Sequence, residues 1–129
     1  MTSTRHVLVV ASRAAAADEL RKALLARADR GPAEFTLLLP APADAEGEAG
    51  VLLRGAVEDL RAAGLDIAGQ LGEADAIAAV TAVWDASEYD EIVVATLPPG
   101  RSHWLALGVP EQIERSTGVP VERVEVQDA

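Results

Sequence analysis

Short apolar runs and amphipathic stretches alternate along the whole chain. Five of the apolar runs predict β-strands, at residues 6–11, 34–40, 66–71, 91–96 and 121–126. The first and fourth runs are continuously apolar, which is typical of parallel strands that are covered on both faces. The third and fifth runs alternate between apolar and other residues, so we expect them at the two edges of the sheet.

Four stretches between these runs repeat apolar residues with helical spacing. They predict helices at residues 14–29, 50–63, 73–86 and 110–117. Gly64 is expected just beyond the second helix, Pro110 suits the first position of the last, and Trp84 is expected in the core. The acidic segment 41–50, rich in Ala and Gly, is predicted to be a mobile connector whose carboxylates are solvated.

The predicted strands and helices alternate strictly, beginning and ending with a strand. This order indicates an α/β fold in which right-handed crossovers place helices on both faces of a parallel sheet. We therefore expect one Rossmann-like domain over residues 1–129, with five strands in the spatial order 3-2-1-4-5. The sequence shows no internal repeat and no second domain.

Composition excludes several classes of partner and chemistry. The chain has 129 residues and a net charge of −10, whereas a nucleic acid or an anionic membrane surface requires a basic face. It has no cysteine, which excludes disulfides, thiolate catalysis and sulfur-ligated zinc. The first apolar run is too short for a signal peptide or a membrane span, so we expect a cytoplasmic protein.

A ligand site in such a sheet lies outside the carboxyl ends of the strands, where the strand order reverses. In the predicted order, that point lies between the first and fourth strands. It brings the loop at Ser12 close to the loop that holds Gly100, Arg101 and Ser102. Leu39, near the end of the second strand, is expected beside them in an apolar slot. A strand, a glycine-containing loop and a helix start have the outline of a phosphate cradle.

The start of the last predicted helix argues against a bound triphosphate. A helix N-terminus holds an anion through free N–H groups, and Pro110 removes one of them. Glu111 places a carboxylate in the first turn, and two like charges about 4 Å apart repel by on the order of 4 kcal/mol at an effective dielectric near 20. An exposed helix end stabilises an anion by only about 0.3–1 kcal/mol. Arg101 is the nearby counter-charge that the sequence suggests.

Other polar residues do not converge on a catalytic centre. Ser102 and His103 are adjacent, and adjacent residues rarely align as nucleophile and base. Glu88, Asp90 and Glu91 precede the fourth strand, so we expect them in a solvated turn at the opposite edge of the sheet. A phosphoacceptor domain of the receiver type is excluded, because the acidic residues that it needs after the first and third strands are missing.

Two long segments carry a family resemblance, GEADAIAAVTAVWDASEYDEIVVAT at 72–96 and TLPPGRSHWLALGVPEQIERSTGVPVERVEV at 96–126. In the first, Gly72 opens the third predicted helix and DEIVVAT supplies the fourth strand. In the second, GVPVERVEV provides a small-Pro-Val entry to the last strand. Together with the order and spacing of elements over nearly the whole chain, these segments resemble the universal stress protein family, which implies the fold predicted above.

ATP-binding members of that family carry the motif G-x2-G-x9-G-(S/T), whose backbone amides and hydroxyl hold the phosphates and ribose. Gly100 agrees with its second glycine, whereas Leu97, Pro110 and Glu111 replace the first glycine, the third glycine and the Ser/Thr. Ser12 stands near the place of the family's adenine-side aspartate. The resemblance therefore indicates a divergent member with a degraded ATP-binding motif, for which we expect no cofactor. An adenine nucleotide is the alternative.

The resemblance also implies a dimer. In the family, the last strand pairs with its counterpart across a two-fold axis. Here that strand begins at Val121 and ends at Val126, and it carries charges of both signs at Glu122, Arg123 and Glu125. Such a strand suits isologous pairing at a sheet edge.

We therefore hypothesise a universal-stress-protein-like, dimeric binding or regulatory module of the stress response that neither binds ATP nor acts as an enzyme, with a further protein as a conceivable partner. The first alternative is a family member that binds AMP, adenosine or ATP in a rebuilt site. The second is a small hydrolase or transferase that uses Ser102, His103 or Glu111.

Overall fold

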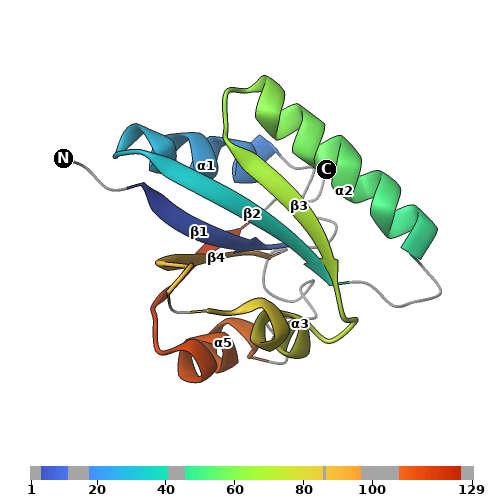
Figure 1. The fold of residues 1–129 in the computed structure, drawn as a ribbon, viewed down its shortest axis with the longest axis vertical. Coiled ribbons are helices and arrows are strands. Elements are labelled where there is room, and N and C mark those ends of the chain that lie inside the picture. The colour runs from blue at the N-terminus through green and yellow to red at the C-terminus, as the bar shows by residue number, and fades with distance from the viewer. Residues whose placement is uncertain (1–3, 12–17, 41–45, 86, 97–107, 126–129) are drawn as a thin grey trace.

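Five parallel strands form the centre of the molecule (Figure 1). The structure is a computed structural model and describes residues 4–11, 18–40, 46–85, 87–96 and 108–125. The strands are β1 (Arg5–Val10), β2 (Ala33–Pro40), β3 (Ile67–Gly72), β4 (Glu91–Thr96) and β5 (Val121–Glu125). Their order in the sheet is β3-β2-β1-β4-β5, and every neighbouring pair is parallel. The predicted fold class and strand order are confirmed.

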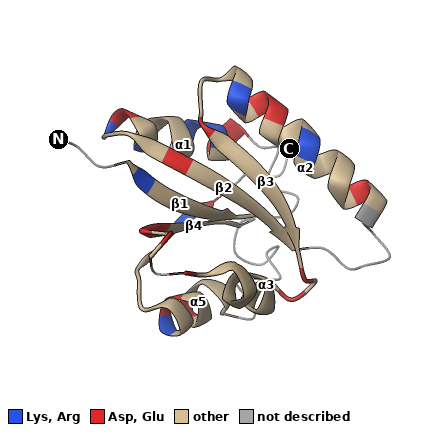
Figure 2. Cartoon of the chain, viewed as in Figure 1, with Lys and Arg blue, Asp and Glu red and all other residues tan. Residues whose placement is uncertain are grey.

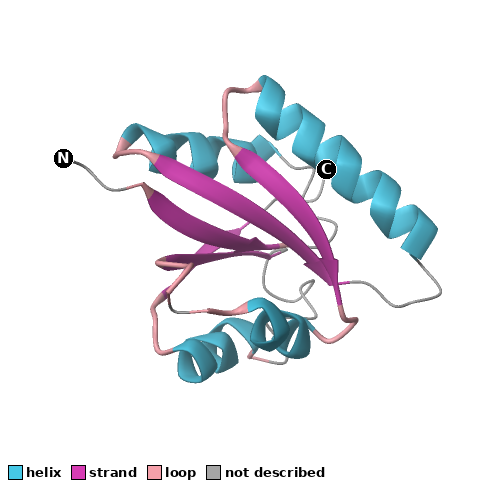
Figure 3. Cartoon of the chain, viewed as in Figure 1, coloured by secondary structure: helices cyan, strands magenta, loops and turns pink. Residues whose placement is uncertain are grey.

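Helices cover both faces of this sheet (Figures 1 and 3). Helices α1 (Asp18–Asp29) and α2 (Glu46–Ala62) lie on one side, and helices α3 (Ala76–Val83) and α5 (Val109–Thr117) lie on the other. Successive side chains of a strand point to opposite faces. Val7 and Val9 of β1 therefore join the core cluster on the α1 and α2 side, whereas Leu8 and Val10 join the cluster on the α3 and α5 side.

The two strands predicted at the edges are edge strands. All four residues from Val7 to Val10 of the central β1 are fully buried, and every residue of β4 after Glu91 is buried. In contrast, β5 has no buried residue and β3 has one, Ile67. Burial on both faces explains why the central strands show no polar alternation in the sequence.

The predicted connector at 41–50 is partly wrong, because α2 already begins at Glu46. Residues 41–45 lie outside the described part of the chain. Glu48, expected as a loop charge, is an exposed residue of the helix. Carboxylates in the first turn of a helix are favoured by the helix dipole, so an acidic stretch that resembles a loop can also start a helix. The Ala and Glu residues around it have good helix propensity.

Helix α3 is shorter than predicted because both of its ends are set by local hydrogen bonding. The Asp75 carboxylate accepts hydrogen bonds from the amides of Ile77 (2.9 Å) and Ala78 (3.4 Å), so the helix begins after it instead of at residue 73. Trp84 has left helical geometry, with φ −65° and ψ 129°. Its half-buried ring stacks on Tyr89 at a centroid distance of 5.9 Å and packs against the core, as expected for this residue.

Helix α5 begins one residue earlier than predicted. Gly108 precedes it in the left-handed region, with φ 67° and ψ 33°, where a residue with a Cβ is disfavoured. Pro110 therefore lies within the first turn but is not its first residue. Gly118, with φ 77°, ends the helix, and its amide donates to the carbonyl of Glu114 at 2.9 Å.

Candidate functional site

The strand order reverses between β1 and β4, at the place where a ligand site was predicted. The two strands pair over Val7–Val10 and residues 91–94. Ala11 follows β1, is fully buried, and donates its amide to the Leu38 carbonyl at 3.2 Å. Thr96 ends β4 with only 4% of its surface exposed. In the described residues, the base of the expected crevice is therefore apolar apart from the hydroxyl of this threonine.

The described part of the chain contains two of the six predicted site residues, Leu39 and Glu111. Leu39 is 2% exposed and belongs to the same core cluster as Ala11, so the apolar surroundings expected for it are present. The other four predicted site residues, which are Ser12, Gly100, Arg101 and Ser102, lie outside the described ranges. Their contribution to a site stays a prediction, as does a contact between Leu39 and a ligand.

Glu111 occupies the first turn of α5, as predicted, and its carboxylate forms an ion pair that the sequence did not suggest. Its Oε1 lies 3.4 Å from an Nη atom of Arg123 on β5. Both side chains are about half exposed. The expected counter-charge was Arg101, which is not among the described residues. Arg123 was missed because its proximity follows from the pairing of β5 with β4 and not from a local motif.

The N-terminus of α5 is thus compensated within the chain. The N–H of Gln112 donates to the carbonyl of Gly108 at 3.0 Å, and Pro110 has no N–H. The Glu111 carboxylate supplies the negative charge that a helix N-terminus favours, and Arg123 balances that carboxylate. An incoming phosphate at this helix end would compete with an acid that is already there.

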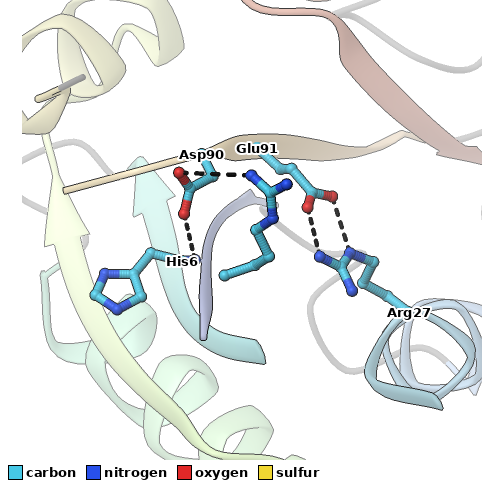
Figure 4. A network of polar contacts seen from close by, with 5 residues as sticks. His6, Arg27, Asp90 and Glu91 are labelled. Atoms are coloured by element: carbon cyan, nitrogen blue, oxygen red, sulfur yellow. Dashed lines mark hydrogen bonds and ion pairs between the residues drawn. The ribbon is translucent and has the colours of Figure 1, made fainter. Parts of the chain in front are cut away.

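A second polar arrangement lies at the opposite, amino-terminal edge of the sheet (Figure 4). Arg27 of α1 is almost completely buried and binds the carboxylate of Glu91, the first residue of β4. Its Nε donates to Oε1 at 2.9 Å and an Nη donates to Oε2, which makes the pair bidentate. The hydrogen bond from Arg27 holds the pKa of Glu91 below its ordinary value, although partial burial opposes this shift. The same hydrogen bond raises the pKa of Arg27.

The prediction of a solvated turn is therefore wrong for Glu91, which is partly buried at the start of β4, whereas Glu88 and Asp90 are exposed as expected. Asp90 accepts a hydrogen bond from the His6 amide at 3.0 Å and lies 3.8 Å from a guanidinium nitrogen of Arg5 (Figure 4). These contacts join the starts of β1 and β4. Their role is structural, because they hold the two strand ends together.

One sequence signal could have revealed Arg27. The buried residues of α1 are Leu20, Leu24 and Arg27, which follow the i, i+4, i+7 spacing of a helix face that points to the core. An arginine at such a position needs a buried acid. The partner Glu91 is 64 residues away, so only the fold identifies it.

The described residues contain neither a candidate metal site nor a candidate membrane-spanning helix. Among them, no group of three or more His, Asp or Glu side chains is arranged to hold a metal ion. None of the described helices is long and apolar enough to cross a membrane.

Solved structures of universal stress proteins are similar to this chain. A universal stress protein in complex with cAMP aligns with a TM-score of 0.65 and 20% identity, over 96% of this chain and 99% of that one. A universal stress protein from Archaeoglobus fulgidus aligns with a TM-score of 0.59 and 20% identity, over 95% of this chain and 99% of that one. No protein-family model matches the sequence, and no curated protein matches it.

These alignments cover nearly all of each chain, and they agree with the strand order described above. The resemblance inferred from the segments at 72–96 and 96–126 is supported at the level of structure. The protein therefore has the fold of the universal stress proteins.

Proposed function

We propose that this protein is a universal-stress-protein-like regulatory module of the stress response that acts by binding, without hydrolysing or binding ATP. The observation that carries the proposal is the ion pair of Glu111 and Arg123 at the start of α5. The corresponding helix start is where the resemblance to ATP-binding members implies a phosphate contact. In this chain the helix start holds the carboxylate of Glu111, and it has one N–H fewer because residue 110 is a proline.

Electrostatics indicate how much this carboxylate opposes a triphosphate. At about 4 Å, two like charges repel by about 1 kcal/mol in water and about 4 kcal/mol at an effective dielectric near 20. The Glu111 side chain is 52% exposed, so the lower end of that range applies. About 1.4 kcal/mol corresponds to a tenfold change in affinity. We therefore expect Glu111→Gln to raise the affinity for ATP about fivefold.

Calorimetric titration with ATP and magnesium tests the proposal. We expect no saturable heat from the wild-type protein and weak binding by Glu111→Gln. Glu48→Gln, which removes an exposed carboxylate from α2, is the matched control and should behave as the wild type. Micromolar ATP binding by the wild-type protein contradicts the proposal.

The module is proposed to act as a homodimer through β5. This strand lies at an edge of the sheet, and its exposed Glu122, Arg123 and Glu125 offer both signs of charge to a second copy. Arg123→Glu leaves only acidic charges on the strand and should weaken association at least tenfold in sedimentation equilibrium. Arg54→Glu on the exposed face of α2 makes the same change in charge elsewhere and should leave association unaltered. A monomeric wild-type protein at high micromolar concentration contradicts the dimer.

A cyclic or monophosphorylated nucleotide is the second candidate ligand, because one of the structurally similar proteins was solved in complex with cAMP. A single phosphate meets less repulsion from Glu111 than a triphosphate, since it carries fewer charges. Titration with cAMP, AMP and adenosine separates this alternative from the main proposal. Binding of any of the three in the micromolar range favours a rebuilt nucleotide site, and no binding removes it.

A further inference from the structure

The outer edge of β3 has the features of an unoccupied strand-pairing site. β3 is the last strand on its side of the sheet among the described residues (Figure 1). Natural proteins commonly protect such edges with lysine, proline or a bulge. The β3 sequence is Ile-Ala-Gly-Gln-Leu-Gly, which carries no charge and no proline. Ala68, Gly69 and Gln70 in its middle are exposed.

The pairing register identifies which backbone groups face outward. The Phe35 amide donates to the Asp66 carbonyl at 2.8 Å, and Phe35 is paired with Ile67. In a parallel ladder, alternate residues direct both of their backbone groups to the same neighbour. Asp66, Ala68 and Gln70 therefore bond to β2, whereas Ile67, Gly69 and Leu71 present their N–H and C=O groups to the outside.

One of these outward-facing backbone groups already has a hydrogen-bond partner. The carbonyl of Ile67 accepts a hydrogen bond from Arg61 Nε of α2 at 2.7 Å, which confirms the direction assigned to it. No hydrogen bond from another described residue covers the outward groups of Gly69. A lysine or another residue that would protect the edge does not fit easily in place of Gly69, because a Cβ there would lie 2.8 Å from Val57 Cγ2. The open part of the edge is thus centred on Gly69.

A hollow of about 370 Å³ adjoins this edge on the opposite face of β3 from α2. Its lining includes Thr36 of β2 and Ala68 of β3. Three carboxylates line it, those of Glu34, Asp66 and Glu88. Among the described residues, Glu34 pairs with His6 at 3.1 Å, whereas no ion pair or hydrogen bond involves the carboxylates of Asp66 and Glu88.

From these two features we infer that the β3 edge binds an extended, basic segment of another protein as an added strand. Gly69 and Leu71 would supply backbone hydrogen bonds, as in other cases of β-strand addition. An added strand lies about 4.8 Å from β3, and alternate side chains would stand over the same face as Ala68. A lysine or arginine at such a position reaches the carboxylates of the hollow.

Charge distinguishes this partner from a second copy of the chain. Each copy has a net charge of −10. Acidic residues stand at both ends of β3 (Figure 2). They are Asp66 before the strand and Glu73 after it, and both are exposed. Two copies paired through this edge would bring like charges together, which is destabilising for directly opposed residues. The mixed charges of β5 suit self-association. Beside β3, the three carboxylates of the hollow outnumber the guanidinium of Arg61, so this edge suits a basic partner.

The test uses the full chain, labelled with ¹⁵N, and a synthetic ten-residue peptide of alternating valine and lysine. We expect saturable binding in which the amides of Gly69 and Leu71 shift and gain protection from hydrogen exchange, while those of Ala68 and Gln70 change little in protection. The same peptide with glutamate in place of lysine should not bind. Equal binding of both peptides, or binding that leaves the Gly69 amide unprotected, overturns the inference.

A matched pair of variants links the binding to this surface. Ala68→Lys places a cation over the hollow at an exposed position and should weaken peptide binding at least tenfold. Ala26→Lys makes the same change at an exposed position of α1 and should alter binding less than twofold. Far-UV circular dichroism of both variants verifies that they fold. Unchanged binding by a folded Ala68→Lys protein, or protection that maps to β5, contradicts the proposed site.

Discussion

Replacing Glu91 with glutamine should lower the stability of the fold more than replacing any one exposed carboxylate among the described residues. The change leaves the guanidinium of Arg27 buried, with its side chain only 8% exposed, while its anionic partner is gone. Removing one partner of a fully buried pair costs about 3–5 kcal/mol, and exposed pairs contribute about 0.2–1 kcal/mol. The Glu91 side chain is 33% exposed, so we expect an intermediate loss of about 2 kcal/mol.

Urea unfolding measures this loss. For a slope of about 1–3 kcal/mol per molar urea, a loss of about 2 kcal/mol lowers the midpoint by roughly 1 M. Glu34→Gln, which removes an exposed carboxylate that pairs with His6, is the control and should cost less than about 0.5 kcal/mol. Combining Glu91→Gln with Arg27→Met should cost less than the sum of the single changes, because no buried charge is then left alone. Equal losses for Glu91→Gln and Glu34→Gln, or strict additivity, would refute this reasoning.

The same pair predicts a dependence of stability on pH. The pKa of Glu91 is lowered in the folded protein, chiefly by the hydrogen bond from Arg27. A lowered pKa contributes stability that is fully present above the unfolded value, near 4.3, and is lost as the pH falls through the folded value. Wild-type stability should therefore decrease in acid more steeply than that of Glu91→Gln. Parallel profiles below about pH 4.3 would contradict this prediction.

Further predictions concern two glycines and the side chain that caps α3. Gly69→Ala should destabilise the protein by about 1–3 kcal/mol, because the new Cβ would lie 2.8 Å from Val57 Cγ2. Gly55→Ala on α2, where a Cβ meets nothing within 4 Å, should instead stabilise it by about 0.5–1 kcal/mol, and thermal unfolding compares the two. Asp75→Ala should cost about 1 kcal/mol by removing the cap of α3, whereas Asp75→Asn should retain most of the stability in urea titrations.

The sequence predicted the layout of the sheet because burial leaves a direct mark on composition. The run at 91–96 matches β4 at both ends, since each residue after Glu91 is buried. The alternation at 66–71 and 121–126 correctly indicated the edges. These features depend only on whether a residue faces the core, which a local pattern records.

Helix boundaries were predicted less well, because single side chains decide them. The start of α2 at Glu46 lies in an acidic stretch whose composition suits a loop as well as the first turn of a helix. The start of α3 depends on the Asp75 carboxylate. Both signals are a few residues long and are compatible with more than one structure.

The sequence predicted the place of the candidate site but not the contacts between its residues. Its place at the β1 and β4 ends followed from the order of elements, and Glu111 was identified from its position after Pro110. The counter-charge Arg123 and the pair of Arg27 with Glu91 join segments that are distant in sequence. Such contacts depend on the register of the strands and on how the helices pack over them, which the apolar pattern alone does not specify.

The most direct test of the central claim is an amide chemical-shift map of the ¹⁵N-labelled protein with excess ATP and magnesium. If the start of α5 is already compensated by Glu111 and Arg123, the amides of Gly108, Val109 and Glu111 should keep their positions up to millimolar nucleotide. Saturating shifts of these amides at micromolar ATP would show that the helix end holds phosphate, and they would contradict the account given for this protein.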